Sequence, residues 1–196
     1  MHPELISLCL FMFVTSCSPG PNNIVASYSG FNFGIIKTIP HMLGVIFGFT
    51  FLVIVMNFGL INIFQKFPIV QEILKYTGSA FLIYMAYKIS FSKNNTDNST
   101  KNPVKFYETF FFQFINPKSV IVAVIMISTY VEKGQNFYNY SFWTIGVAFT
   151  FAVISIIFWT LIGKFLRKFA TNEKFIKRFN YVMSLLLVGC IATFYL

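Results

Sequence analysis

The sequence predicts an all-α membrane protein, and three observations support this fold class. Of its 196 residues, 56% are hydrophobic and only 11% are charged, with a mean hydropathy of +0.68, which is too apolar for a water-soluble globule. Uncharged runs long enough to cross ~30 Å of hydrocarbon recur along the chain. Two of these runs contain strong helix breakers. We expect six transmembrane helices, at about 5–28, 40–64, 69–91, 107–131, 141–164 and 178–196.

The first predicted span is interrupted by the run Ser18-Pro19-Gly20-Pro21-Asn22-Asn23. Proline has no N–H to donate, and its ring crowds the carbonyl four residues earlier. Lipid offers no hydrogen bonds, so such freed backbone groups are tolerated only where protein or a water-filled cavity receives them. A simple proline kink is the alternative. A helix broken in this way is typical of a substrate path.

The second and third predicted spans carry weaker signals. Gly44 and Gly48 form a Gly-x-x-x-Gly pair in span two, which predicts close helix packing. Span three is the least certain, because Glu72, Lys75 and Lys88 leave only its middle free of charge. These charged ends must reach the membrane interfaces if the segment spans.

The polar segment 92–105 predicts a cytoplasmic linker between two three-helix halves, 1–91 and 106–196. Halves with an odd number of spans enter the membrane in opposite orientations, which predicts an inverted 3+3 repeat. Each half opens with a broken helix, because span four is interrupted at Asn116-Pro117-Lys118-Ser119. We expect the two breaks to meet near the midplane, where the N-termini of the following half-helices attract anionic groups.

The net charge of +9 indicates topology rather than nucleic-acid binding. If the six spans are right, one side of the membrane receives eleven of the fifteen Lys and Arg residues, in three loops. The positive-inside rule places these loops in the cytoplasm and both termini outside it.

The two breaks supply most of the candidate substrate-binding residues. Lys118 is the only basic residue well inside a span. Its ammonium either pairs with a substrate carboxylate, or it snorkels to the interface or bonds free carbonyls such as that of Gln113. The amides at the breaks either hold the ammonium group of a zwitterion or satisfy the local backbone. The candidates are Pro19, Gly20, Pro21, Asn22, Asn23, Gln113, Asn116, Pro117 and Lys118.

No acidic residue lies inside a predicted span, which disfavours metal transport, and we expect no cofactor. If a proton gradient drives the protein, the candidate coupling residues are His41 and Glu108. An interfacial position for His41, without a role in coupling, is the alternative.

At these motifs the chain resembles the LysE/RhtB family of bacterial amino-acid exporters. The resemblance covers nearly the whole chain, and Pro-Gly-Pro-Asn in the first span together with Asn-Pro-Lys in the fourth is fairly specific. It implies a multi-pass protein of the bacterial inner membrane that exports amino acids using the proton motive force. The matching segments are Ser18–Asn22, Gly44 with Gly48, Leu74–Leu82 and Phe114–Ser119.

Departures from the family pattern concern the substrate. Phe49 stands where many relatives carry a polar or acidic residue, and Ala86 replaces a frequent glycine. A site with Lys118 and no acid would receive a cationic side chain poorly, which favours neutral amino acids.

These features predict a secondary exporter of amino acids or related metabolites that works by alternating access and is not an enzyme. A divalent-metal exporter and a thiol-redox conduit, which would use Cys17 and Cys190, are the alternatives. The expected partners are a small-molecule substrate and membrane lipid, with no nucleic acid; a homo-oligomer stays open.

Overall fold

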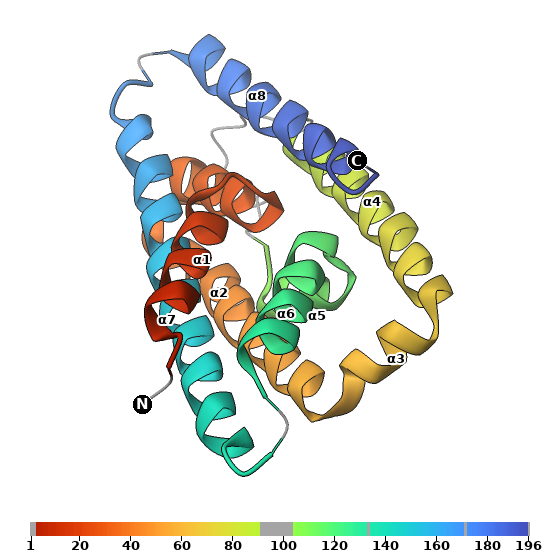
Figure 1. Cartoon of the computed structure of the whole chain (residues 1–196). Helices are drawn as coiled ribbons and strands as arrows, with labels where there is room; N and C mark the ends of the chain where they lie inside the picture. Colours follow the sequence, from red (N-terminus) through yellow and green to blue (C-terminus); the bar gives the residue numbers. More distant parts are fainter. Residues whose placement is uncertain (1–2, 91–103, 133, 171, 196) are drawn as a thin grey trace.

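The computed structural model describes residues 3–90, 104–132, 134–170 and 172–195, and all regular elements within them are helical. The predicted all-α class is therefore confirmed (Figure 1). Most of the predicted linker, 92–105, lies outside the described residues. The elements are α1 (Leu5–Cys17), α2 (Pro21–Val55), the π-helical turn η1 (Met56–Leu60), α3 (Ile61–Lys66), α4 (Pro68–Ser90), α5 (Phe106–Ile115), α6 (Pro117–Tyr130), α7 (Phe137–Arg167) and α8 (Glu173–Ala192).

Three continuous helical stretches in the described residues are long and apolar enough to cross a membrane: Pro21–Leu60, Phe137–Arg167 and Glu173–Ala192. The pair α5 and α6, bent by 62° at its break, makes a fourth span if it is counted as one. Helix α1 is apolar but short. Helix α4 has the length of a span and is not among them, as its charged ends led us to expect. The full count of six spans stays a prediction.

The first two predicted spans share the helix α2. Its helical geometry fails at Gly34, which has φ 77° and ψ 177° and separates a segment 21–33 from a segment 35–55. This positive φ favours glycine, because other residues have a Cβ that clashes with the backbone there. Gly34 lies between the predicted spans 5–28 and 40–64, so both were approximately placed, and the structure locates the change of direction at this glycine.

Both predicted breaks are present. Helix α1 ends at Cys17, the chain continues through extended Ser18 and Gly20, and Pro21 begins α2. Asn116 is likewise extended between α5 and α6, with Pro117 at the first position of α6. A proline fits this position because the first helical N–H has no intrahelical partner.

Close helix contacts hold the two breaks in place. A Cβ on Gly48 would lie 2.8 Å from Gln113 Cγ and from the Phe110 carbonyl, so the predicted packing role of this glycine is confirmed against α5. Gly163 on α7 faces the backbone of Ser27 on α2 in the same way. Figure 1 shows α4 and α8 side by side at the edge of the molecule.

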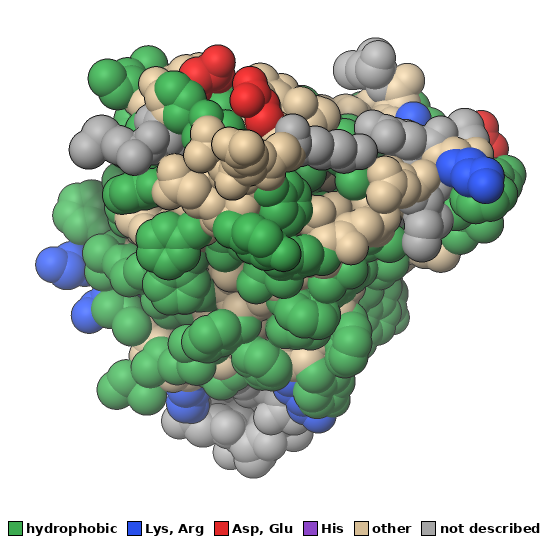
Figure 2. Space-filling view, turned by 60° about the horizontal axis from the view of Figure 1, so that its bottom comes forward, with side chains coloured by type: hydrophobic (Ala, Val, Ile, Leu, Met, Phe, Trp, Pro, Cys, Tyr) green, Lys and Arg blue, Asp and Glu red, His purple; other side chains and the backbone are tan. Residues whose placement is uncertain are grey.

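The surface agrees with a membrane location. In Figure 2 hydrophobic side chains cover the broad middle of the visible face, while charged side chains gather toward its ends. The exposed fraction of Ile36 is 82% and that of Leu185 is 70%. Surfaces of this kind are stable facing lipid and costly in water.

Candidate functional site

The two breaks contact each other through Lys118. Its ammonium donates to the backbone carbonyl of Ser18 at 3.0 Å, to the Ser18 hydroxyl at 2.7 Å and to the Pro19 carbonyl at 3.5 Å. The backbone ladder of α1 has ended at these carbonyls, so side chains bond them instead, and the Ser18 carbonyl also accepts from the Asn23 amide. The sequence-based alternative, that the ammonium bonds free backbone carbonyls, describes this arrangement, although the acceptors are Ser18 and Pro19 of the first break and not Gln113, which was the example given.

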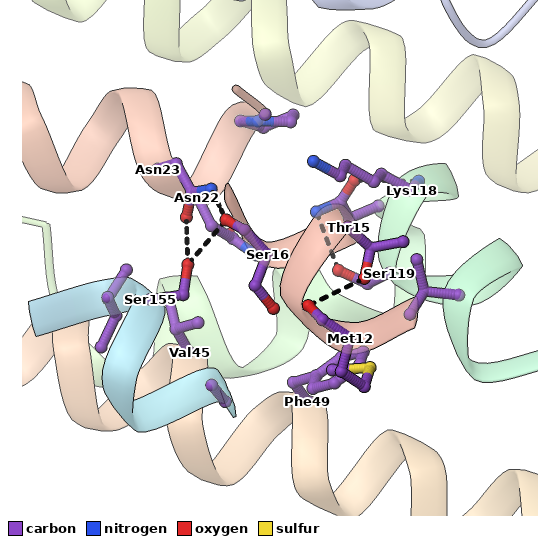
Figure 3. Close-up of a pocket in the computed structure, with 16 residues that line it drawn as sticks. Met12, Thr15, Ser16, Asn22, Asn23, Val45, Phe49, Lys118, Ser119 and Ser155 are labelled. Atoms are coloured by element: carbon purple, nitrogen blue, oxygen red, sulfur yellow. Dashed lines mark hydrogen bonds between the residues drawn. The ribbon is translucent and has the colours of Figure 1, made fainter. Parts of the chain in front are cut away.

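A cavity of about 80 Å³ lies between the breaks (Figure 3). Six predicted site residues line it: Gly20, Pro21, Asn22, Asn23, Asn116 and Lys118. Three others do not line it: Pro19 is exposed, while Pro117 and Gln113 are buried behind it. The remaining lining residues are Met12, Thr15, Ser16, Val45, Phe49, Ser119, Val122, Ala152, Ser155 and Ile156.

Two helix N-termini end at this cavity. The first residue of α2 is Pro21, and no side chain caps this helix. Helix α6 is capped by Asn116, whose side-chain oxygen accepts from the Lys118 backbone N–H at 3.2 Å. Each N-terminus carries about half a positive charge, in addition to the Lys118 ammonium. The electrostatics of the cavity therefore favour an anionic group.

The Lys118 side chain is half-buried, and the partners found among the described residues are neutral oxygens. The acidic residue Glu108, at the start of α5, pairs instead with Lys88 of α4, at 3.9 Å. Gly20 leaves room for the lysine, because a Cβ there would lie 2.9 Å from both Cδ and Nζ of Lys118.

The amide side chains at the breaks mainly satisfy local groups, which was the alternative in the sequence analysis. Asn23 donates to the carbonyls of Ser16 at 3.0 Å and Ser18 at 3.1 Å. Asn116 donates to the Ser119 hydroxyl at 3.0 Å, besides capping α6. The two amides therefore hold the breaks in shape.

Asn22 and Gln113 join the two halves of the chain directly. The Asn22 amide donates to Gln113 Oε1 at 2.8 Å, and the Gln113 amide donates back to Asn22 Oδ1 at 3.1 Å. The Ser119 hydroxyl donates to the same Gln113 oxygen at 3.0 Å. Gln113 therefore positions two cavity residues without lining the cavity itself.

Sequence reasoning missed several hydroxyl groups of the cavity. Ser155 on α7 donates to the Ser16 carbonyl at 3.0 Å and toward Asn23 Oδ1 at 3.4 Å, and Figure 3 shows this group on one wall. Ser119 follows Lys118 directly in the sequence, so the second break could have indicated it as a cavity residue. Ser155 lies in an uninterrupted helix and had no such signal.

The two coupling candidates occupy different places. His41 has an exposed fraction of 2%, and its Nε2–H donates to the Asn22 carbonyl at 3.3 Å, while its Nδ1 lies 2.9 Å from the Thr109 hydroxyl. Protein therefore encloses His41, and its ring contacts the backbone of the cavity residue Asn22. Glu108 accepts from the Lys105 backbone N–H at 2.9 Å at the start of α5 and does not line the cavity.

The residues required by the two alternative functions do not come together in the described structure. Cys9, Cys17 and Cys190 are free thiols. Within the described residues there is no group of three or more His, Cys, Asp and Glu side chains that could hold a metal ion. No observation favours the metal or thiol alternative.

An apolar helical protein whose two broken helices meet at a cavity lined by both polar and apolar side chains belongs to the class of multi-pass membrane transporters. The chain belongs to the LysE type translocator family, whose model matches residues 13–195. This is a family of translocators and not of enzymes.

Curated relatives match over nearly their whole length. A cysteine/O-acetylserine efflux protein of Salmonella choleraesuis (strain SC-B67) is 29% identical over 194 residues, which cover 97% of each chain. The protein of the same name from Escherichia coli (strain K12) is 28% identical with the same coverage. No solved structure matches this chain.

Proposed function

We propose that this protein is a secondary active exporter of small neutral amino acids and related metabolites across the bacterial inner membrane. The observation that carries the proposal is the Lys118 ammonium, which faces the cavity between two helix N-termini with neutral oxygens as its partners. The efflux of cysteine and O-acetylserine by the named relatives supports substrates of this class.

In this proposal the substrate carboxylate binds at Lys118 and at the N-termini of α2 and α6. It replaces the carbonyl of Ser18 as the partner of the ammonium. A carboxylate attracts the ammonium with a full negative charge, whereas a carbonyl offers only a dipole, so the exchange is favourable although the lysine is already bonded. Anchoring by the carboxylate explains why one site accepts several amino acids.

The substrate ammonium group binds at the wall that carries Ser155 and Asn23. The Ser16 carbonyl, the Ser155 hydroxyl and Asn23 Oδ1 supply acceptor atoms there. No carboxylate lines the cavity to balance a second positive charge, so lysine-like and arginine-like side chains are disfavoured. A cavity of about 80 Å³ is several times the ~10–15 Å³ that one water needs and suits a small amino acid.

The two three-helix halves, 1–91 and 106–196, form an inverted repeat in this proposal, joined by the segment 92–105. The contacts between helices of the two halves support the proposal: α2 packs with α7, and α4 packs with α8. The site lies between the halves, as alternating access requires. Rocking of one half against the other breaks and remakes the Asn22–Gln113 pair.

The basic loops lie in the cytoplasm, and both termini lie outside it. Arg167, at the end of α7, stacks on Phe31 near the bend of α2 with 5.3 Å between the guanidinium carbon and the ring centre. Phe31 also contacts Phe175 at the start of α8. The bend of α2, the end of α7 and the start of α8, close to which many of the basic residues lie, are therefore on one side of the molecule. This supports placing the basic loops together in the cytoplasm.

His41 couples transport to protons in this proposal. In the neutral ring, Nε2–H donates to the Asn22 carbonyl and Nδ1 accepts from the Thr109 hydroxyl. On protonation, Nδ1–H donates to the Thr109 oxygen, and this hydroxyl turns to donate to the Lys105 carbonyl, 3.4 Å away. Asn22 lines the cavity and contacts His41, so the two events are physically linked.

The test is accumulation of labelled amino acids in energised inside-out vesicles, with and without a protonophore. We expect protonophore-sensitive uptake of cysteine, O-acetylserine or another small neutral amino acid. Replacing Lys118 by Gln should lower kcat/KM about 10- to 100-fold, because it removes a charged hydrogen bond of ~1.5–3 kcal/mol. The exposed Lys174→Gln variant is the matched control. Sealed, energised vesicles that take up no amino acid would contradict the proposal.

A further inference from the structure

We propose that the apolar wall of the cavity is a subsite for the substrate side chain and that Phe49 sets the largest side chain it accepts. The inference rests on the proposed amino-acid export and specifies its substrate class. The wall is built from four helices: Met12 of α1, Phe49 of α2, Val122 of α6, and Ala152 and Ile156 of α7.

Lys118 and the Phe49 ring lie on different sides of the cavity, with Ser16 and Ser119 between them and Ser155 beside Val45 (Figure 3). Figure 3 shows Lys118 and Asn22 on one side, with Met12, Phe49 and Val45 on the other. An amino acid whose carboxylate is held at Lys118 and whose ammonium faces Ser155 has one remaining substituent on its α-carbon. That substituent, the side chain, is directed to the apolar wall.

The position of the Phe49 ring is restrained by its surroundings. Its exposed fraction is 8%, and it packs in one hydrophobic cluster with Met12, Val122 and Ala152. The preceding residue, Gly48, lies so close to Gln113 and the Phe110 carbonyl that the backbone cannot move toward α5. The ring therefore limits the space beside it instead of yielding to a larger ligand.

This wall selects by polarity and by size. Uncharged side chains gain free energy when they leave water, whereas a charged side chain has no partner among the wall residues. A side chain as large as that of leucine or methionine meets the Phe49 ring. The expected substrates are α-amino acids with small uncharged side chains, such as alanine, serine and cysteine.

The test measures uptake of a series from alanine to leucine and methionine in inside-out vesicles. Phe49→Ala should raise the ratio of kcat/KM for leucine to that for alanine by about tenfold or more, as expected when a pocket gains several methylene volumes. Phe47→Ala is the matched control, because Phe47 is on the same helix, 50% exposed, and does not line the cavity. Its ratio should equal that of the wild type.

A second variant moves the specificity in the opposite direction. Ala152→Leu fills the subsite from α7 and should lower kcat/KM for cysteine more than that for alanine, so that the ratio of the two shifts toward the smaller amino acid. If Phe49→Ala fails to accumulate in the membrane, Ala152→Leu decides the question. Unchanged ratios in the variants that do accumulate would overturn the subsite and leave amino-acid export standing. Failure of the wild type to take up any amino acid would instead overturn the proposed function.

Discussion

At the scale of single residues, the site depends on a lysine that is free to exchange partners. Lys118 is bound to neutral carbonyl and hydroxyl oxygens and lies against Gly20. A partner of opposite charge within the protein would hold the ammonium more strongly and compete with the substrate. Neutral partners satisfy the ammonium when the site is empty and release it at a small cost.

Gly20→Ala tests whether the Lys118 side chain lies against the backbone of Gly20. The added Cβ would lie 2.9 Å from Cδ and Nζ of Lys118, so the flexible lysine side chain moves instead of the backbone. We expect KM for the exported amino acid to rise several-fold with little change in melting temperature. Gly189→Ala, which meets no atom within 4 Å, is the control. An unchanged KM would contradict the position assigned to the lysine.

His41→Gln tests the coupling mechanism. Glutamine keeps hydrogen-bonding capacity toward Asn22 and Thr109 but does not take up a proton near neutral pH. We expect uptake in inside-out vesicles to lose most of its dependence on pH and on the protonophore, while exchange of labelled for unlabelled substrate continues. Full protonophore sensitivity in this variant would move the coupling role to another group, such as Glu108.

The residues found from sequence and those missed differ in the strength of their local signals. A charge or a proline within an apolar run stands out without any structure, which is why Lys118, Pro21 and Pro117 were identified. Phe49 is one of 27 phenylalanines, and only the family resemblance drew attention to it. Ser155 sits in an unbroken helix and was missed, because only the packing of α7 against α2 brings it to the cavity. The amide side chains were identified from the sequence. Their hydrogen-bond partners could not be predicted, because they depend on the course of the backbone through the two breaks.

At the scale of helices, the breaks are maintained by side chains that replace lost backbone bonds. The Ser16 carbonyl receives bonds from Asn23, Ser155 and Trp159, the last from its indole N–H at 3.4 Å. Trp159 and Ser155 belong to α7, so this helix stabilises a break in the other half of the chain. The break was predictable from its prolines, but its support from α7 was not.

Gly163→Ala tests the contact between α7 and the first segment of α2. A Cβ at Gly163 would overlap the Ser27 carbonyl, and backbone cannot turn aside as a side chain can. We expect the free energy of unfolding in detergent to fall by about 1–3 kcal/mol. Gly146→Ala on the same helix has open space and should be neutral. Equal melting temperatures for the two variants would contradict this packing.

The boundaries of the helices were predicted unevenly. The predicted span 141–164 lies within α7 (Phe137–Arg167), and the break at Asn116 was placed correctly, because charges and prolines mark these ends. The place where α2 bends was not predicted. A single glycine, Gly34, separates its two helical segments, and nothing in its neighbourhood distinguishes it from other glycines.

At the scale of the whole molecule, two broken helices from separate halves of the chain enclose one cavity. The Asn22–Gln113 pair and the Lys118 bonds to Ser18 are direct polar links between the halves. Both links are made of hydrogen bonds, which exchange readily for others of similar strength. This is the mechanical condition for a transporter that must open in turn to each side of the membrane.

The central claim is that Lys118 binds the substrate carboxylate, and a binding comparison in detergent tests it most directly. The dissociation constant is measured for the best transported amino acid and for its primary amide, with the wild type and with Lys118→Gln. We expect the wild type to prefer the amino acid by at least tenfold, and the variant to bind both with similar, weaker affinity. Retention of the full preference in the variant would contradict the account.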